Sequence, residues 1–186
     1  MKRRKVFIFA VILGLLFGTT VITFALTSLF YTQSIKTNLN KKTVFQFNLN
    51  TELQDLEVGP GDSFSVKPSI YNDGTDEMYV FIKIEMPCNT DDPIYTYETG
   101  SDWILVNSDK GIEEYAYGSS EMIPLQPGET TTSLFEKMTM KSISYADYAG
   151  IDDINVTITG YAIGTEDIST NPVEAWNICK ELGDIE

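Results

Sequence analysis

From residue 43 to the C-terminus, apolar and polar residues alternate along the chain in short runs. In the run 43–50, Phe45, Phe47 and Leu49 fall on one face of an extended chain and polar residues fall on the other. A period of two is typical of strands with one buried face, so each run predicts a strand. The runs are 43–50, 63–71, 77–87, 103–107, 114–118, 131–140 and 154–160.

Two of these predicted strands are strongly apolar on one face, and we expect both faces to point into one core between two sheets. Short strands with a turn signal about every ten residues, and almost no helical periodicity, predict an all-β fold, an antiparallel β-sandwich. The two core-facing sets are Met78, Val80, Ile82, Ile84 and Met86 in the first strand, and Ile154, Val156 and Ile158 in the second.

Turn residues separate these runs. Asp73 and Gly74 lie between the runs 63–71 and 77–87, and an Asp-Gly pair accepts positive φ at little cost, which predicts a hairpin. Pro68 lies inside the run 63–71, so that strand is predicted to lie at a sheet edge or to contain a bulge there.

A short sequence pattern occurs twice, at 58–63 and at 125–130. Both copies place Pro-Gly at the centre, followed by an acid and then a hydroxyl residue. Proline presets φ at the first central position and glycine takes positive φ at the second, so both copies predict type II turns. We expect the two turns to be matching corners of two sheets, each followed by a strand.

One short helix is predicted near the C-terminus. Asn171 is a suitable N-cap, Pro172 suits the first helical position, and Glu174 completes a capping box. Gly183 is the expected stop signal of this helix.

The N-terminus has a different pattern, in which four cations at 2–5 precede an uncharged run of 25 residues at 6–30. As a helix this run would extend about 37 Å, and the apolar core of a bilayer is about 30 Å thick. The pattern predicts an N-terminal apolar helix, either a signal peptide cut after Ala25 or a retained membrane anchor, with everything beyond it delivered outside the cell. The chain then divides into a leader at 1–30, a linker at 31–42 and a β-sandwich domain at 43–186.

The charge balance excludes some classes of partner. The chain has 13 basic and 27 acidic residues; without the four leader cations nine basic residues remain, and the net charge is −18. Such a surface repels nucleic acid and anionic lipid, so we expect no nucleic-acid partner, and contact with a membrane only through an uncleaved leader. Solubility outside the cell is the expected role of the acidity, with divalent-cation binding as the alternative.

Two cysteines, Cys88 and Cys179, lie outside the leader. In an oxidising compartment they either form a disulfide, which would close a loop of roughly 90 residues and stabilise the fold by about 4–5 kcal/mol, or remain two separate thiols. The sequence leaves both alternatives open.

The residue inventory disfavours catalysis and bound metal. The chain has no histidine, which removes the usual zinc ligands and the usual base for a serine or cysteine nucleophile. The acidic pairs at 91–92 and 152–153, and Asp73 with Asp76, do not follow the spacing of a calcium loop. We therefore expect no enzyme activity, no metal site and no cofactor.

Aromatic residues suggest two alternative roles. We expect them to pack the sandwich core or to pair across strands, and the alternative is a platform that binds sugars. The residues concerned are Tyr95, Tyr97, Trp103, Tyr115 and Tyr117.

Several of these pieces, taken in order along the chain, resemble the TasA/camelysin group of exported bacterial proteins. The most specific piece is LQPGETTTSLF at 125–135, and the next is SIYNDGTDEMYVFIKIEMP at 69–87. The other pieces are the basic and apolar leader, the phenylalanine-bearing run 43–50, the Pro-Gly-Asp corner at 60–62, Trp103, the tyrosines of 114–117 and Ala175-Trp176.

The resemblance implies a fold and a function. The fold would be a sandwich of the jelly-roll type, secreted or held at the surface of a bacterium. The function would be that of a non-catalytic structural protein, a subunit of a cell-surface or biofilm-matrix fibre that associates with itself or with a related matrix subunit. The alternative function is a membrane-anchored extracellular module that binds a ligand.

The first predicted strand suggests how such a subunit would assemble. A strand near the free end of a chain pairs either with its own sheet or with the open edge of a neighbour. A head-to-tail contact of the second kind does not close on itself and propagates as a filament. Phe45, Phe47 and Leu49 are the expected anchoring side chains, with Lys41 and Lys42 meeting an acidic neighbour.

Overall fold

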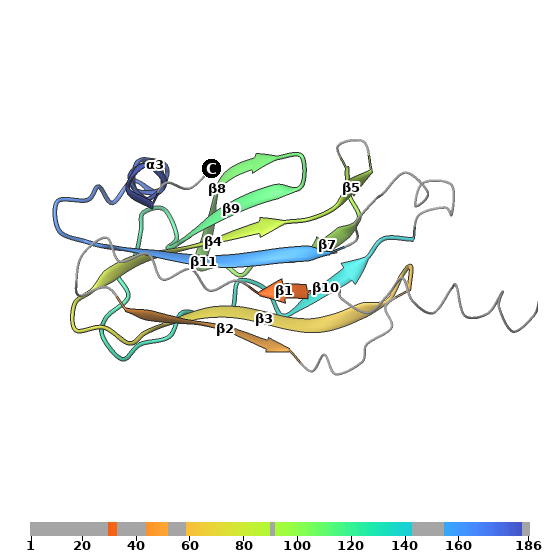
Figure 1. The fold of residues 1–186 in the computed structure, drawn as a ribbon, viewed down its shortest axis with the longest axis horizontal. Coiled ribbons are helices and arrows are strands. Elements are labelled where there is room, and N and C mark those ends of the chain that lie inside the picture. The colour runs from red at the N-terminus through yellow and green to blue at the C-terminus, as the bar shows by residue number, and fades with distance from the viewer. Residues whose placement is uncertain (1–29, 33–43, 52–58, 90–91, 143–154, 184–186) are drawn as a thin grey trace, which may run out of the picture.

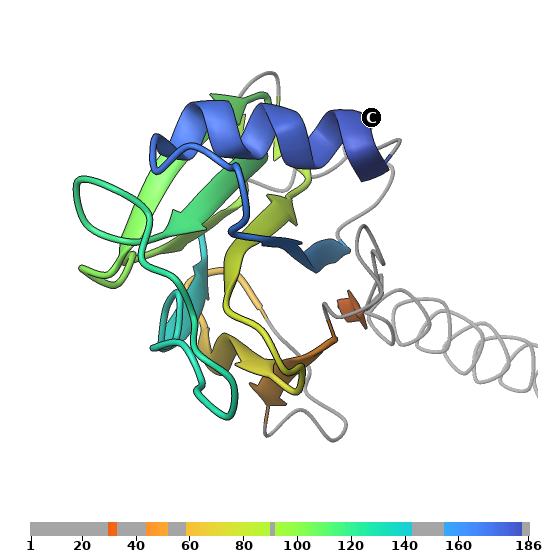
Figure 2. The ribbon, with the colours of Figure 1, turned by 90° about the vertical axis from the view of Figure 1, so that its left-hand side faces the viewer.

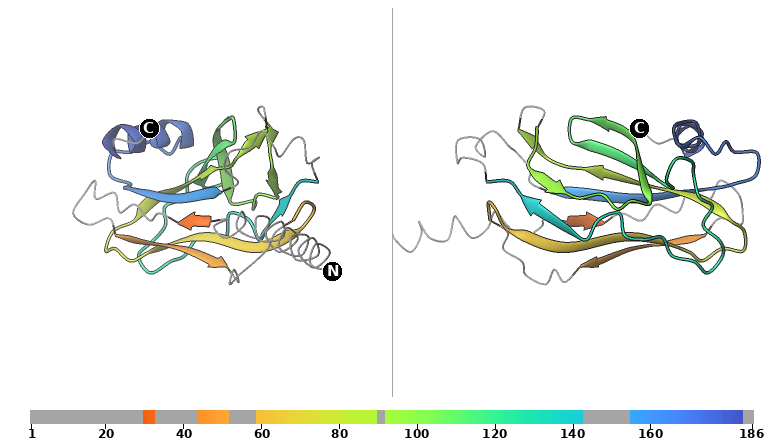
Figure 3. Two further views of the ribbon diagram at one scale, coloured as in Figure 1. Left: turned by 45° about the vertical axis from the view of Figure 1, so that its right-hand side comes forward. Right: turned by 180° about the vertical axis from the view of Figure 1, so that it is seen from behind.

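The computed structural model describes residues 30–32, 44–51, 59–89, 92–142 and 155–183. These residues form two β-sheets packed face to face and one C-terminal helix, α3 (Pro172–Gly183) (Figures 1 and 3). One sheet has five strands in the order β1 (Phe30–Thr32), β11 (Val156–Gly164), β4 (Met78–Glu85), β9 (Ile112–Tyr117) and β8 (Trp103–Asp109). The other has four strands in the order β2 (Phe45–Thr51), β3 (Ser63–Asn72), β10 (Lys137–Met140) and β7 (Tyr95–Tyr97).

Antiparallel pairing prevails between these strands, as expected from the sequence. The exception is β1, which pairs in parallel with the start of β11, from Phe30 opposite Val156 to Thr32 opposite Ile158. A small separate ladder joins β5 (Cys88–Asn89) to β6 (Asp92–Pro93). The short strands β5, β6 and β7 have no alternating pattern long enough to predict them.

One continuous core fills the space between the two sheets. The inner face of β4 supplies Met78, Val80, Ile82 and Ile84 to this core, and Met86 follows directly after the strand; each is at most 7% exposed. Across the sheet, Val156 and Ile158 of β11 join the same core, whereas Ile154 lies outside the described residues. The prediction that both faces line one core is therefore confirmed for the residues that are described.

A second, smaller core lies between the outer face of the five-stranded sheet and α3 (Figure 2). The residues of β4 that alternate with the inner set, Tyr79 and Phe81, point into it. Trp176 of α3 contacts Phe81 and Tyr161, with ring centroids 5.0 and 5.3 Å away. Strand β4 is therefore apolar on both faces because a layer lies over each of them.

The C-terminal helix begins and ends as predicted. The Oδ1 atom of Asn171 accepts hydrogen bonds from the backbone N–H groups of Val173 and Glu174, both at 3.1 Å. Ser169 also takes part in the capping box. Its hydroxyl accepts a hydrogen bond from the Asn171 N–H and donates one to the Glu174 carboxylate. The helix ends at Gly183, as predicted.

Both Pro-Gly patterns form the predicted turns. Gly61 and Gly128 have φ of 88° and 80°, and the N–H of the following acid bonds to the carbonyl three residues earlier, at 3.0 Å in each turn. Both acids, Asp62 and Glu129, also accept a hydrogen bond from the first N–H of their own turn.

The location expected for the two Pro-Gly turns is only partly right. The second turn lies where the chain passes from pairing with β4 of the five-stranded sheet to pairing with β3 of the four-stranded sheet, whereas the first turn lies within the four-stranded sheet. Backbone hydrogen bonds join Gly61 to Met140 at the start of β3, and Gly128 to Asn72 at its end. The turns therefore lie at opposite ends of one strand of the four-stranded sheet. Only the first turn leads directly into a strand, since β10 does not begin until Lys137.

The hairpin predicted at Asp73-Gly74 is also wrong. Strands β3 and β4 lie in different sheets, so the chain crosses from one layer to the other here. The buried Asn72 side chain directs this crossing, because its Nδ2 donates to the carbonyls of Asp76 and Leu125 and its Oδ1 accepts from the Gly74 N–H. A positive φ at Gly74 is not needed and does not occur.

Two further differences concern the four-stranded sheet. Strand β3 is an interior strand and pairs with β2 in continuous register, so Pro68 marks neither an edge strand nor a bulge. Pro68 lies beyond the end of the ladder with β10, where the irregular segment 131–136 runs alongside and the Leu134 N–H donates to the Pro68 carbonyl. Only the last four residues of the predicted strand 131–140 are in β10.

The predicted leader falls almost entirely outside the described residues. The predicted junction between leader and linker, at residues 30 and 31, falls inside β1. In the part of the chain that the structure describes, no helix has both the length and the apolar character needed to cross a bilayer.

Candidate functional site

The side chains predicted to anchor assembly lie on β2, an outer strand of the four-stranded sheet. Phe45 is 3% exposed and lies in the core, and Phe47 and Leu49 pack against that core while remaining partly exposed. The Phe47 ring rests on Gly160 of β11, where an added Cβ would lie 2.7 Å from the ring. In this chain β2 is therefore a strand of its own domain, preceded only by the short β1 among the described strands.

The outer edge of β2 is a regular edge that has no strand partner within the described ranges. All seven residues of β2 pair with β3 without a register shift, from Phe45 opposite Asn72 to Thr51 opposite Val66. The N–H and C=O groups on the other side of such a strand are available to another strand.

The remaining edges are less suited to strand addition. Strand β8 has a register shift between Leu105 and Asn107, and an irregularity of this kind twists and protects an edge. Strand β7 has only three residues. On the side of β11, the residues beyond its pairing with β1 are buried, with Thr159 and Ile163 4% and 3% exposed.

A polar cluster joins the two sheets between β7 and β9. The Tyr97 hydroxyl of β7 donates to Oε2 of Glu113 on β9, and the Tyr115 hydroxyl donates to the same oxygen at 2.8 Å. The two hydroxyl oxygens lie 3.2 Å apart. Burial raises the pKa of Tyr115 to about 12 and raises the pKa of Tyr97 further. Both phenols therefore keep their protons well above neutral pH and donate to Glu113.

A second buried carboxylate holds α3 to the outer face of the five-stranded sheet. Glu114 is 5% exposed and accepts a 2.6 Å hydrogen bond from the Trp176 indole N–H. The Lys180 Nζ lies 3.7 Å from the same oxygen and 5.6 Å from the centre of the Trp176 ring. This arrangement compensates a buried charge with one hydrogen-bond donor and one nearby cation from the same helix, which is a structural role.

The two cysteines are recorded as thiols, in different parts of the fold. Cys179 is a buried residue of α3, and burial raises the pKa of its thiol to about 12. Cys88 lies on β5, and Figure 1 shows β5 and α3 toward opposite ends of the molecule. The disulfide that the sequence left open is therefore not formed in this structure.

The aromatic residues pack the core, as expected. Tyr95, Trp103 and Tyr115 are at most 6% exposed, and Tyr97 and Tyr117 pack against the same cluster. They do not form an exposed platform for sugars.

The acidic pairs do not gather into a metal site in the part of the chain that is described. Asp73 accepts a hydrogen bond from the Gln46 side chain, while Asp91, Asp152 and Asp153 lie outside the described residues.

The sequence reasoning missed Glu113 and Glu114, the two acids with the most specific partners. Their adjacency on a strand means that one points between the sheets and the other points beneath α3. An acid within a mostly apolar strand was the available signal, but the donors come from distant elements that the strand pattern does not specify.

No protein-family model and no curated protein matches this chain. The relationship to the TasA/camelysin group therefore remains a prediction from the sequence motifs.

Proposed function

We propose that this chain is an exported, non-catalytic structural protein, a subunit of a cell-surface or biofilm-matrix fibre of a bacterium. The leader pattern at 1–30 and the ordered motifs at 69–87 and 125–135 support export and membership of the TasA/camelysin group. A sandwich of two sheets is compatible with the jelly-roll topology of that group. Its partners in the fibre are copies of itself or a related subunit.

The observation that carries the proposal is the regular outer edge of β2. A strand from a neighbouring copy that pairs with this edge would extend the four-stranded sheet by β-augmentation. If the neighbouring copy contributes a strand other than β2, the contact is head-to-tail and repeats as a filament. The bulge on β8 disfavours strand addition at that edge of the other sheet.

Pairing a neighbour's strand with the edge of β2 costs less free energy than donation, in which β2 itself inserts into a neighbour. Donation would withdraw Phe45 and Phe47 from their own core, and each buried phenylalanine is worth about 1.5–3 kcal/mol. Edge pairing leaves these side chains in place. A strand exchange that moves β2 would therefore need a neighbour that offers an equivalent apolar site.

The non-catalytic part of the proposal rests on residue chemistry. The chain has no histidine, and the carboxylate–phenol cluster at Glu113 is occupied by internal hydrogen bonds. We expect the purified protein to hydrolyse neither casein nor common glycosides, with or without added zinc or calcium. Metal-dependent turnover that a single carboxylate substitution abolishes would contradict this expectation.

The assembly test compares two Leu→Lys variants on opposite edge strands. Leu49→Lys places an inward-facing cation on β2, a device by which natural edge strands prevent pairing. Leu105→Lys is the matched control, because Leu105 lies on the bulged edge strand β8 and is 51% exposed. Light scattering and electron microscopy should find fibres or large oligomers for the wild type and for Leu105→Lys, and monomers for Leu49→Lys.

Thermal unfolding must accompany this comparison, so that loss of assembly is separated from loss of the fold. Equal assembly of Leu49→Lys and the wild type would exclude the edge of β2. Absence of assembly by every version, at all salt concentrations and pH values tried, would exclude the structural function.

The alternative function is a membrane-anchored extracellular module that binds a ligand. The uncharged run at 6–30 is long for a signal peptide, which favours an anchor. Mass spectrometry of the native N-terminus separates the two functions. A chain that begins after Ala25 supports the secreted subunit, and a chain that retains residues 2–30 supports the tethered module.

A further inference from the structure

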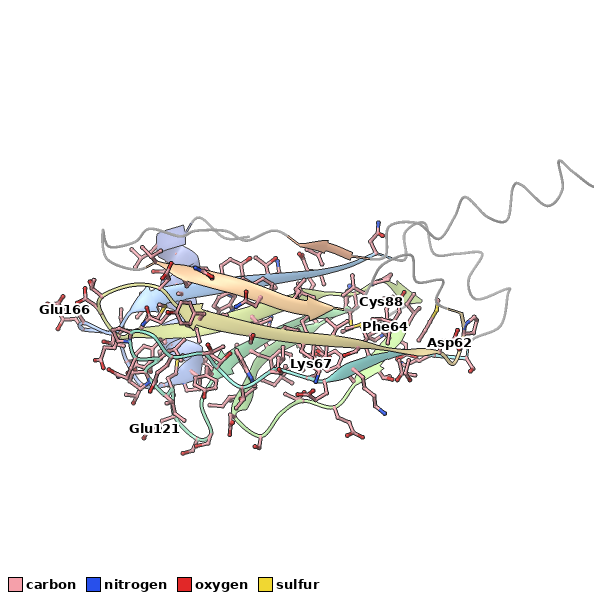
Figure 4. All side chains as sticks on the ribbon, turned by 90° about the horizontal axis from the view of Figure 1, so that it is seen from below. Asp62, Phe64, Lys67, Cys88, Glu121 and Glu166 are labelled. Atoms are coloured by element: carbon pink, nitrogen blue, oxygen red, sulfur yellow. The ribbon has the colours of Figure 1, made fainter. Side chains whose placement is uncertain are left out.

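The outer face of the four-stranded sheet is uncovered in the part of the chain that is described. The helix α3 lies on the other layer (Figures 1 and 2), and Figure 4 views the molecule from the side of the uncovered face, where Lys67 of β3 is labelled. Alternation along the strands assigns the outward side chains. They are Gln46, Asn48, Ser63, Ser65, Lys67, Tyr71, Thr96, Lys137 and Thr139, together with Ser69, which is only 6% exposed.

None of these outward side chains is a carboxylate, although the chain has 27 acidic residues. The outer face of the five-stranded sheet carries Glu85 and Glu114, which pair with Lys83 and Lys180. The two cations of the uncovered face have acids near them, because Lys67 pairs with Glu136, and Lys137 and Glu98 line the same groove. The face is therefore close to neutral on a strongly acidic protein.

The side chains of this face form an ordered array of hydroxyl and amide groups. Thr96, Thr139 and Ser63 are opposite one another on three adjacent strands, and the hydroxyls of Ser63 and Thr139 lie 2.7 Å apart. Neighbouring strands are about 4.8 Å apart and alternate residues of a strand about 6.8 Å apart, so the hydroxyls form a flat grid. Each hydroxyl both donates and accepts hydrogen bonds.

A groove of about 370 Å³ continues this face beyond β7. It is lined by hydroxyls from Ser101, Thr132 and Ser133, by the carboxylates of Asp102, Glu98 and Glu136, and by the Lys137 cation. The Asp102 carboxylate is held in place, because Thr132 and Ser101 donate to its two oxygens at 3.0 and 3.3 Å. The volume lies at the lower end of the range for sites that bind small ligands.

We propose that this face and its groove bind a neutral polysaccharide. A polymer rich in hydroxyl groups matches a surface that offers donors and acceptors and in which Lys67 and Lys137 nearly balance Glu98, Asp102 and Glu136. An anionic polymer would be repelled by the net charge of −14, and a cationic polymer would be attracted to the acidic surfaces elsewhere. A second copy of the chain is a poorer match, because apposing two polar faces without apolar contact gives little stabilisation.

The mode of binding follows from the missing aromatic platform. Tyr71 is the one half-buried aromatic residue among the outward side chains, so each sugar unit gains hydrogen bonds but little stacking. Individual contacts are then weak, and affinity arises from many units of one chain held at once. The polymer should bind, whereas the free monosaccharide should not compete. This inference does not rest on fibre assembly.

The test is electrophoresis of the purified protein in native gels that contain a polysaccharide. The gels contain dextran or a soluble β-1,3-glucan as neutral probes, polygalacturonate as the anionic probe, or chitosan as the cationic probe. We expect slower migration in at least one neutral gel, no slowing in polygalacturonate, and no reversal by free glucose.

Two variants with the same change in charge locate the site. Thr96→Glu combined with Ser63→Glu places two carboxylates on the face, at exposed positions that the core does not need. Thr75→Glu combined with Ser120→Glu places the same groups on exposed loops elsewhere. The first variant should weaken binding at least about tenfold and the second should not. Thr96→Val combined with Ser63→Ala removes the hydroxyls without adding charge and should also weaken binding.

Four results would overturn the proposal. They are migration unchanged by all four polysaccharides, slowing in chitosan alone, equal weakening by both glutamate pairs, and unchanged binding after loss of the hydroxyls. Light scattering of the protein without polysaccharide tests whether a second copy of the chain occupies this face instead. If the face variant abolishes self-assembly and leaves polysaccharide binding intact, the face is an interface between copies.

Discussion

Glu113 and Glu114 are consecutive residues with opposite surroundings. Glu113 points between the sheets and accepts two phenol hydroxyls, whereas Glu114 points outward and accepts the indole N–H of Trp176. Each carboxylate therefore connects β9 to an element that is distant in the sequence. A hydrogen bond to a charged group contributes about 1.5–3 kcal/mol, so both residues should matter for stability.

The substitution Glu113→Gln tests the link between the sheets. It keeps the shape of the side chain and removes the charge that accepts from Tyr97 and Tyr115, so we expect a loss of about 1–3 kcal/mol in the free energy of unfolding. Glu98→Gln is the matched control on an exposed position near β7, with an expected change within about 0.5 kcal/mol. Urea denaturation measures both, and equal effects would show that Glu113 has no special role.

At the scale of elements, α3 has local signals that suffice to place it. The cap at Asn171, the proline that follows and the glycine at the end act over a few residues, and the sequence predicted all of them. Docking of the helix depends on Trp176 and Glu114, which lie 62 residues apart. Nothing within the helix itself predicts that partner.

The substitution Asn171→Ala tests the helix cap. It removes the acceptor of two backbone N–H groups, and we expect a loss of about 1 kcal/mol in the free energy of unfolding. Asn177→Ala makes the same chemical change at an exposed position inside the helix, where alanine has the higher helix propensity, so stability should not fall. Comparable losses for the two variants would contradict the capping role.

The strands with a period-two pattern were predictable, and the connections between them were not. The alternating faces of β4 and β11 follow from a period of two, and so does the start of β3 at Ser63. The crossing after Asn72 was misread as a hairpin, because Asp73-Gly74 favours a tight turn while the Asn72 side chain bonds to Leu125, 53 residues away. The hydrogen bond from Asn72 to Leu125 therefore outweighed the local turn preference. A short sequence pattern cannot predict a bond to a residue so far along the chain.

At the scale of the whole molecule, the inner face of β4 decides whether the two sheets stay together. Ile82 lies in the middle of that face and has no solvent exposure. Ile82→Asp would bury an unpaired charge there, and we expect a loss of roughly 4 kcal/mol or more. Ile123→Asp is the control at a position that is 43% exposed, and it should have a small effect. Thermal unfolding of Ile82→Asp at nearly the wild-type temperature would contradict the sandwich assignment.

The alkaline limit of stability also belongs to the whole molecule, because its titrating groups lie in both cores. Burial raises the pKa of Tyr115, Tyr161 and Cys179 to about 12, and it raises the pKa of Tyr97 and Tyr79. The folded state therefore holds these protons more tightly than the unfolded chain, in which the thiol ionises near pH 9 and the phenols near pH 10. Their contribution to stability is complete below pH 9 and is lost as the pH rises toward 12.

We expect the free energy of unfolding to fall steeply between pH 9 and pH 12, with the buried tyrosines ionising only as the protein unfolds. The near-ultraviolet absorbance of tyrosinate should then rise in two stages, the second coinciding with loss of the far-ultraviolet circular dichroism. Tyr161→Phe removes one late-titrating phenol and should make the fall with pH less steep. If all ten tyrosines ionise in one step near pH 10 while the circular dichroism is unchanged, the two cores do not exclude water as the structure requires.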